Sequence, residues 1–77
     1  MTLTVDDRRA IYRALDADVE KLQRAHEKIA KALRATNYAS PVAERELLCI
    51  RERQARAAYR AAFEVAAEYF DNYLMND

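Results

Sequence analysis

Pro41 is the only proline in this chain of 77 residues, and the chain contains no glycine. Because these two residue types interrupt helices most strongly, the sequence offers a single clear break. Alanine, arginine, glutamate and leucine, which all favour helices, are abundant on both sides of it. We therefore predict one all-α domain, an antiparallel two-helix hairpin with a coiled-coil-like seam.

The segment from about residue 4 to residue 35 carries a regular apolar repeat, which predicts the first helix. Thr4 is placed to cap it, because its hydroxyl can accept a hydrogen bond from an amide near Asp7. Alternating steps of three and four residues are typical of a seam between packed helices. The two rows of this seam are Val5, Tyr12, Val19, His26 and Leu33, and Arg8, Leu15, Leu22, Ile29 and Thr36.

Residues 36–40 are predicted to form the turn, centred near Tyr38, and a second helix should span about 41–74. Ser40 is expected to be its N-cap and Pro41 its first residue, where a missing amide does no harm. Its inward stripe is predicted to be Leu48, Ala55, Ala62 and Tyr69, flanked by Ala58, Tyr59, Val65, Ala66 and Tyr73. A turn near Tyr38 would place small residues opposite large ones, with Ala55 facing Leu22, Ala58 facing Val19 and Ala62 facing Leu15.

Apolar residues near the end of the second helix cover more of its circumference than one neighbouring helix can bury. An unpaired surplus of this kind usually marks an interface. Three interpretations are open: a homodimer forming a four-helix bundle, a docking face for another protein, or a monomer whose aromatic side chains fold over the helix ends. The candidate interface residues are Ile11, Tyr59, Phe63, Tyr69, Phe70, Tyr73 and Leu74.

The net charge is zero, but the charges are unevenly distributed. Residues 1–20 carry three bases and five acids, residues 21–60 carry ten bases and four acids, and residues 61–77 carry four acids and no base. An antiparallel hairpin would therefore be acidic at its termini and basic at its turn. We predict an acidic tip that could engage a basic partner, formed by Glu64, Glu68 and Asp71 beside Asp6, Asp7, Asp16, Asp18 and Asp77.

The basic turn end supports an alternative function, a nucleic-acid-binding accessory protein. The candidate phosphate-binding residues are Arg45, Arg51, Arg53, Arg56 and Arg60. However, the sequence contains no recognisable nucleic-acid-binding motif, and neighbouring glutamates can pair with many of these bases along the helix. A solvated, ion-paired face is the commoner outcome of such a pattern.

Catalysis and cofactor binding are not expected. His26 is the only histidine and Cys49 the only cysteine, and the predicted register places them near each other. A cysteine and a histidine are the minimal pair for a thiol nucleophile, but a two-helix rod has no obvious cleft or oxyanion-binding loop. His26 is better interpreted as a polar residue of the seam that helps to set the register.

The predicted function is therefore a small non-enzymatic module that binds itself or another protein, acting as an adaptor, inhibitor or regulator. The single cysteine and the lack of an apolar leader favour a cytoplasmic location, and no segment is apolar enough to suggest a membrane span. The richness in alanine and arginine is typical of a high-GC bacterial or phage genome.

Overall fold

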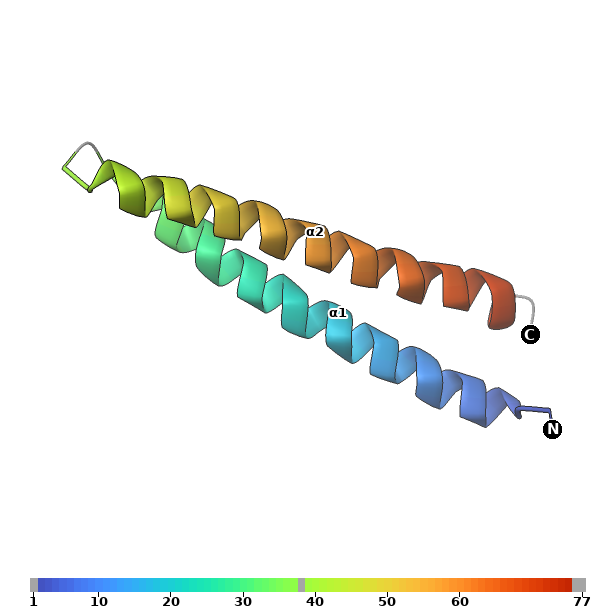
Figure 1. Ribbon diagram of the computed structural model, residues 1–77. Coiled ribbons are helices and arrows are strands. Elements are labelled where there is room, and N and C mark those ends of the chain that lie inside the picture. The colour runs from blue at the N-terminus through green and yellow to red at the C-terminus, as the bar shows by residue number, and fades with distance from the viewer. Residues whose placement is uncertain (1, 38, 76–77) are drawn as a thin grey trace.

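The computed structural model describes residues 2–37 and 39–75, which form two helices packed side by side (Figure 1). α1 spans Val5–Arg34 and α2 spans Val42–Tyr73, and both termini lie at the same end of the molecule (Figure 1). The molecule is a rod with principal extents of 59 × 19 × 14 Å. The predicted antiparallel hairpin is therefore confirmed, and no strand occurs within the two described ranges.

The first helix begins with the cap that the sequence indicates. The Thr4 hydroxyl accepts a hydrogen bond from the Asp7 amide at 3.1 Å, and the Asp7 carboxylate accepts one from the Thr4 amide at 3.1 Å. This reciprocal capping box satisfies two amides that have no partner inside the helix. The bond from the Thr4 amide also holds the pKa of the Asp7 carboxyl below its usual value.

The start of α2 differs from the prediction by one residue. Pro41, with φ −57° and ψ 137°, is the N-cap, and Val42 is the first helical residue. Ser40 does not cap this helix, because its hydroxyl instead accepts a hydrogen bond from the Asn37 amide within the connection, at 3.2 Å. Asn37 in turn accepts bonds from the amides of Ala39 and Ser40, at 2.8 and 3.0 Å. The expected centre of the turn, Tyr38, lies outside the described residues.

The seam of α1 follows the predicted rows closely. Val19 is buried, with 7% of its surface exposed. Val5, at the end of the first row, is exposed, since the partner helix covers it poorly. The remaining members of both rows are half-buried: Arg8, Tyr12, Leu15, Leu22, His26, Ile29, Leu33 and Thr36.

The seam of α2 matches the predicted stripe and two of its five flanking residues, Tyr59 and Ala66, whereas a third flanking residue, Tyr73, is exposed. Ala66 is buried, and the predicted stripe of Leu48, Ala55, Ala62 and Tyr69 is half-buried. Ala58 and Val65, which were expected to flank the stripe, are exposed. Arg45 and Glu52 also belong to the seam, because they lie fourteen and seven residues before Tyr59, respectively, and so share its side of the helix.

The helices are aligned about one residue away from the predicted register. His26 of α1 contacts Glu52 of α2, so Val19 lies nearest the level of Tyr59 rather than that of Ala58. The half-buried state of Tyr59 and the exposure of Ala58 agree with this alignment. The spacing of apolar seam residues does not distinguish two alignments of the helices that differ by one residue. The contact between His26 and Glu52 does distinguish them.

Neither α1 nor α2, as far as the structure describes them, contains an apolar stretch long enough to cross a membrane.

Removal of the Thr4 cap should destabilise the hairpin measurably. We expect Thr4→Ala to lower the free energy of unfolding by about 0.5–2 kcal/mol, because it removes the acceptor for the Asp7 amide. Urea titration followed by circular dichroism measures this change. Thr4→Ser keeps the hydroxyl and should retain most of the stability, whereas equal losses for Thr4→Ala and Thr2→Ala would contradict the role of the cap.

Candidate protein-binding surface

A groove near the termini contains five of the residues expected at an interface or in the acidic tip. This terminal groove has a volume of about 390 Å³ and opens along one side of both helices. From the predicted sets it includes Asp16, Tyr59, Phe63, Phe70 and Asp71. Its full lining is Tyr12, Asp16, Val19, Glu20, Gln23, Tyr59, Phe63, Ala66, Ala67, Phe70 and Asp71.

Two pairs of aromatic rings line the terminal groove. The Tyr12 ring of α1 lies 5.4 Å from the Phe70 ring of α2, measured between centroids, at an interplanar angle of 52°. Tyr59 and Phe63 lie 6.3 Å apart on α2 at 43°. Tilted pairs at these distances are favourable arrangements of aromatic rings. They hold Phe63 and Phe70 beside the groove without burying them.

The remaining predicted interface residues are divided between this groove and other surfaces. Leu74 lies in an adjoining depression with Phe70 and Tyr12. Tyr69 and Tyr73 stack on each other with centroids 4.8 Å apart, Arg8 lies over the Tyr73 ring at 5.3 Å, and neither tyrosine lines the groove. Ile11 lies outside both depressions as well, because it precedes Tyr12 and points about 100° away from it around the helix.

The aromatic side chains do not fold over the helix ends to shield themselves. Phe63 is 53% exposed, and Phe70 and Tyr73 are also exposed. Aromatic anchors of this size bury much area for few restricted torsions when a partner covers them. The structure of the single chain therefore leaves these three side chains uncovered.

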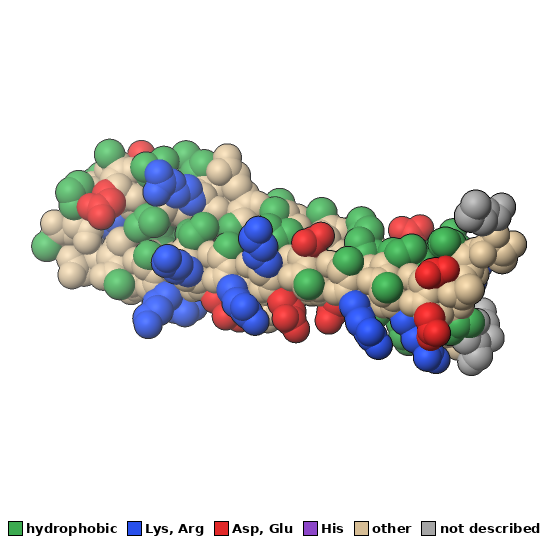
Figure 2. All heavy atoms as spheres, turned by 90° about the horizontal axis from the view of Figure 1, so that it is seen from below, with side chains coloured by type: hydrophobic (Ala, Val, Ile, Leu, Met, Phe, Trp, Pro, Cys, Tyr) green, Lys and Arg blue, Asp and Glu red, His purple; other side chains and the backbone are tan. Residues whose placement is uncertain are grey.

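Acidic residues surround the terminal groove. Asp16, Glu20 and Asp71 line it, and Glu64 and Glu68 are exposed elsewhere on the same half of α2. Figure 2 shows hydrophobic side chains along the whole rod, with Asp and Glu side chains both in its middle and at its terminal end. The acidic tip is therefore partly a rim of the aromatic groove, although Asp77 of the predicted set lies outside the described residues.

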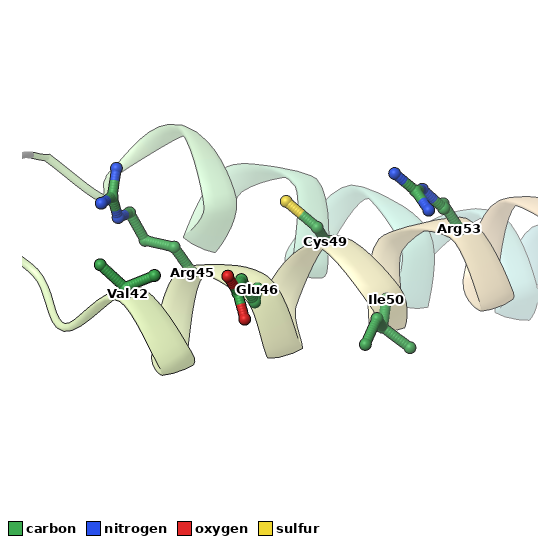
Figure 3. A pocket seen from close by; sticks show the side chains of 6 residues that line it. All are labelled: Val42, Arg45, Glu46, Cys49, Ile50 and Arg53. Carbon is green, nitrogen blue, oxygen red and sulfur yellow. The ribbon is translucent and has the colours of Figure 1, made fainter.

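A second groove lies near the turn and is lined only by α2. This turn groove has a volume of about 540 Å³, and its lining consists of Val42, Arg45, Glu46, Cys49, Ile50 and Arg53. In Figure 3 the side chains of Arg45, Cys49 and Arg53 project to the same side of the helix. The Nε of Arg45 is buried and has no hydrogen-bond partner among the described residues. Such an atom carries a desolvation cost until an acceptor reaches it.

Four of the five arginines of the predicted phosphate site lie within about 80° of one another around α2, and Arg51 lies on another side of the helix. Arg45 and Arg53 line the turn groove, whereas Arg51 lines a different depression with Leu47 and residues of α1. Arg56 donates to Glu52 at 3.2 Å. Arg60 is exposed and lines neither groove. A backbone-tracking nucleic-acid site needs its bases along one face, a requirement that Arg51 does not meet together with the other four arginines.

His26 forms the main polar contact between the helices. Its Nε2 donates to Oε1 of Glu52 at 2.9 Å, and only 16% of the Glu52 side chain is exposed. The bond from His26 holds the pKa of the Glu52 carboxyl below its usual value, against the opposing effect of burial, and the Arg56 charge adds to the lowering. This contact supports the interpretation of His26 as a register-setting residue.

Glu52 was missed in the sequence, and Cys49 was assigned in its place as the neighbour of His26. The signal was present, because Glu52 belongs to the seven-residue row that contains Arg45, Tyr59 and Ala66. Cys49 is instead a half-buried free thiol on the turn groove. Within residues 2–37 and 39–75, no group of three or more histidine, cysteine or acidic side chains is arranged to hold a metal ion.

No protein-family model matches the chain, and no curated protein or solved structure is significantly similar to it. The two grooves are therefore interpreted from their own residues.

The contribution of Glu52 to stability should depend on pH. Its pKa is lowered in the folded state, so the stabilisation is present above the ordinary glutamate pKa of about 4.3 and is lost as the pH falls through the folded value. We expect wild-type protein to be more stable than Glu52→Gln at pH 6, with the difference shrinking toward zero near pH 3. Urea unfolding at each pH provides the measurement.

Glu20→Gln is the matched control for this experiment, because Glu20 pairs with Arg24 four residues away at 3.7 Å in an exposed position. Surface pairs of this kind contribute little. A difference between wild type and Glu52→Gln that stays constant from pH 3 to pH 6 would show that the His26 contact does not stabilise the charged carboxylate.

Proposed function

We propose that this chain is a small non-enzymatic protein–protein interaction module, an adaptor, inhibitor or regulator. It binds a protein partner through the terminal groove and the acidic rim of that groove. The observation that carries the proposal is the exposure of Phe63 and Phe70 beside a preformed groove that also contains Tyr12 and Tyr59.

The extent of the uncovered surface supports this function. The molecule exposes 6251 Å² at a mass of 8.9 kDa. A typical folded protein of this mass exposes about 4,800 Å², so the excess is about 1,400 Å². A standard protein interface covers about 800 Å² on each partner. The excess is thus large enough to accommodate a full interface.

The chemistry of the groove indicates what kind of partner it takes. The aromatic side chains favour apolar residues of a partner, whereas Asp16, Glu20 and Asp71 favour bases at the edge of the contact. A helix that presents an apolar stripe flanked by lysine or arginine has both features. The high-GC composition is in keeping with a bacterial or phage regulator of this type.

A single substitution in the groove should abolish partner binding. We expect Phe63→Asp to remove the partner, because it places a charge where the centre of the contact must be desolvated. Tagged wild-type and variant chains are incubated with extract of the source organism, and retained proteins are identified by mass spectrometry. Retention of the specific partner should fall at least about 10-fold, as expected for loss of a central aromatic anchor.

Val65→Asp is the matched control, because Val65 is 53% exposed, as Phe63 is, but does not line the terminal groove. Helix content by circular dichroism should be the same in both variants, since both positions are exposed in the hairpin. The proposal is contradicted if wild type, Phe63→Asp and Val65→Asp retain the same proteins in equal amounts.

A further inference from the structure

The two grooves lie on the same side of α2, at opposite ends of one line of side chains. Residues seven apart are almost two full turns apart and therefore lie above one another along a helix. The first two members of this line belong to the turn groove and the last two belong to the terminal groove. The line consists of Val42, Cys49, Arg56, Phe63 and Phe70.

This line has approximate mirror spacing about Arg56. Cys49 and Phe63 are each seven residues from it, and Val42 and Phe70 are each fourteen residues from it. A second copy of α2 running in the opposite direction would therefore bring each small residue of the turn groove next to a phenylalanine of the terminal groove. Two equal contacts would result, as a twofold axis requires.

We propose that a second copy of this chain occupies the terminal groove, packed antiparallel to the first copy with Arg56 near the twofold axis. This inference rests on the proposed function and names the partner. Phe63 and Phe70 of each copy fill the turn groove of the other, beside Cys49 and Val42. The product is a four-helix bundle with both grooves of both chains covered.

Charge complementarity selects the antiparallel arrangement. Three acids line the terminal groove, Asp16, Glu20 and Asp71, whereas two arginines, Arg45 and Arg53, and one acid, Glu46, line the turn groove. Antiparallel packing places acids of one copy beside arginines of the other, whereas parallel packing would place acids beside acids. It also brings carboxylates toward the Nε of Arg45, which has no acceptor in the described part of the single chain.

Arginines of the two copies meet at the centre of the contact, Arg56 beside Arg56 and Arg53 beside Arg60, and the Glu52 carboxylates offset part of their repulsion. Each Arg56 already donates to Glu52 of its own chain at 3.2 Å, so two ion pairs meet near the axis rather than two free cations. The line contains no acidic residue, so the twofold axis does not bring two acidic residues of this line together.

The surface available matches what a stable dimer needs. Two separate chains expose 6251 Å² each. A compact dimer of twice the mass should expose about 8,000 Å² in total, which leaves about 4,500 Å² to be buried on association. Permanent homodimers bury about 2,000–5,000 Å².

The first test is the mass of the wild-type chain in solution. Sedimentation equilibrium should give twice the chain mass of 8.9 kDa. Phe63→Asp should raise the dissociation constant of the dimer at least about 30-fold, the loss typical of a central aromatic anchor. Val65→Asp should leave it nearly unchanged. A wild-type chain that sediments as a monomer at 100 µM overturns the inference.

The second test determines the orientation by disulfide formation under mild oxidation. In the proposed dimer, Phe63→Cys places a thiol opposite Cys49 of the other copy, so a cross-linked dimer forms. The wild-type chain and the double variant Phe63→Cys, Cys49→Ser should not cross-link. Their equivalent thiols are about 21 Å apart along the rod, far beyond the reach of a disulfide.

A third variant tests the same alignment without removing the Phe63 side chain, on which the dimer itself depends. Glu46→Cys combined with Ala67→Cys, in a Cys49→Ser background, keeps both phenylalanines and should also cross-link, because these positions face each other in the same alignment. Cross-linking through Cys49 in the wild-type chain would show a parallel dimer and overturn the inference. A dimer in which neither designed pair cross-links overturns it as well.

The two proposals fail in different ways. A monomeric chain whose protein partner is lost with Phe63→Asp refutes the second copy as occupant but retains the interaction function. A chain that binds nothing through Phe63, whether itself or another protein, refutes both.

Discussion

Two packed helices can cover only one stripe of each other's surface, and the other features of this molecule follow from that limit. Val19 and Ala66 are the only buried residues in the described part of the chain. The remaining seam residues are half-buried, and several large apolar side chains are exposed. A rod of this kind has a high ratio of surface to volume, so it gains less from hydrophobic burial than a compact domain of equal mass.

The contact between His26 and Glu52 provides what the apolar seam lacks, which is a defined alignment along the rod. Leucine and alanine rows can slide past each other by one residue at small cost, whereas a hydrogen bond of 2.9 Å between partly buried groups cannot. Glu52 also accepts a hydrogen bond from Arg56 on the outer surface of α2. One carboxylate therefore contacts both the residue that sets the alignment of the helices and an arginine of the outer surface. This link connects the register of the hairpin with the region proposed as the centre of the dimer.

The two grooves differ in shape and charge although they lie on one side of the same helix. Large aromatic side chains and acids border the terminal groove, and small apolar side chains and arginines border the turn groove. Each groove therefore has the features that the other one lacks.

The sequence by itself determined the two helices, the cap at Thr4, the position of the connection and most of the seam, because these depend on local propensity and on the spacing of apolar residues along one chain. It also identified Phe63 and Phe70 as surplus to the hairpin. Only the tertiary structure decided the alignment of the helices and the pairing of His26 with Glu52 rather than with Cys49. These features depend on how far one helix is shifted and rotated against the other, and a change of one residue moves a side chain by about 100° around the helix.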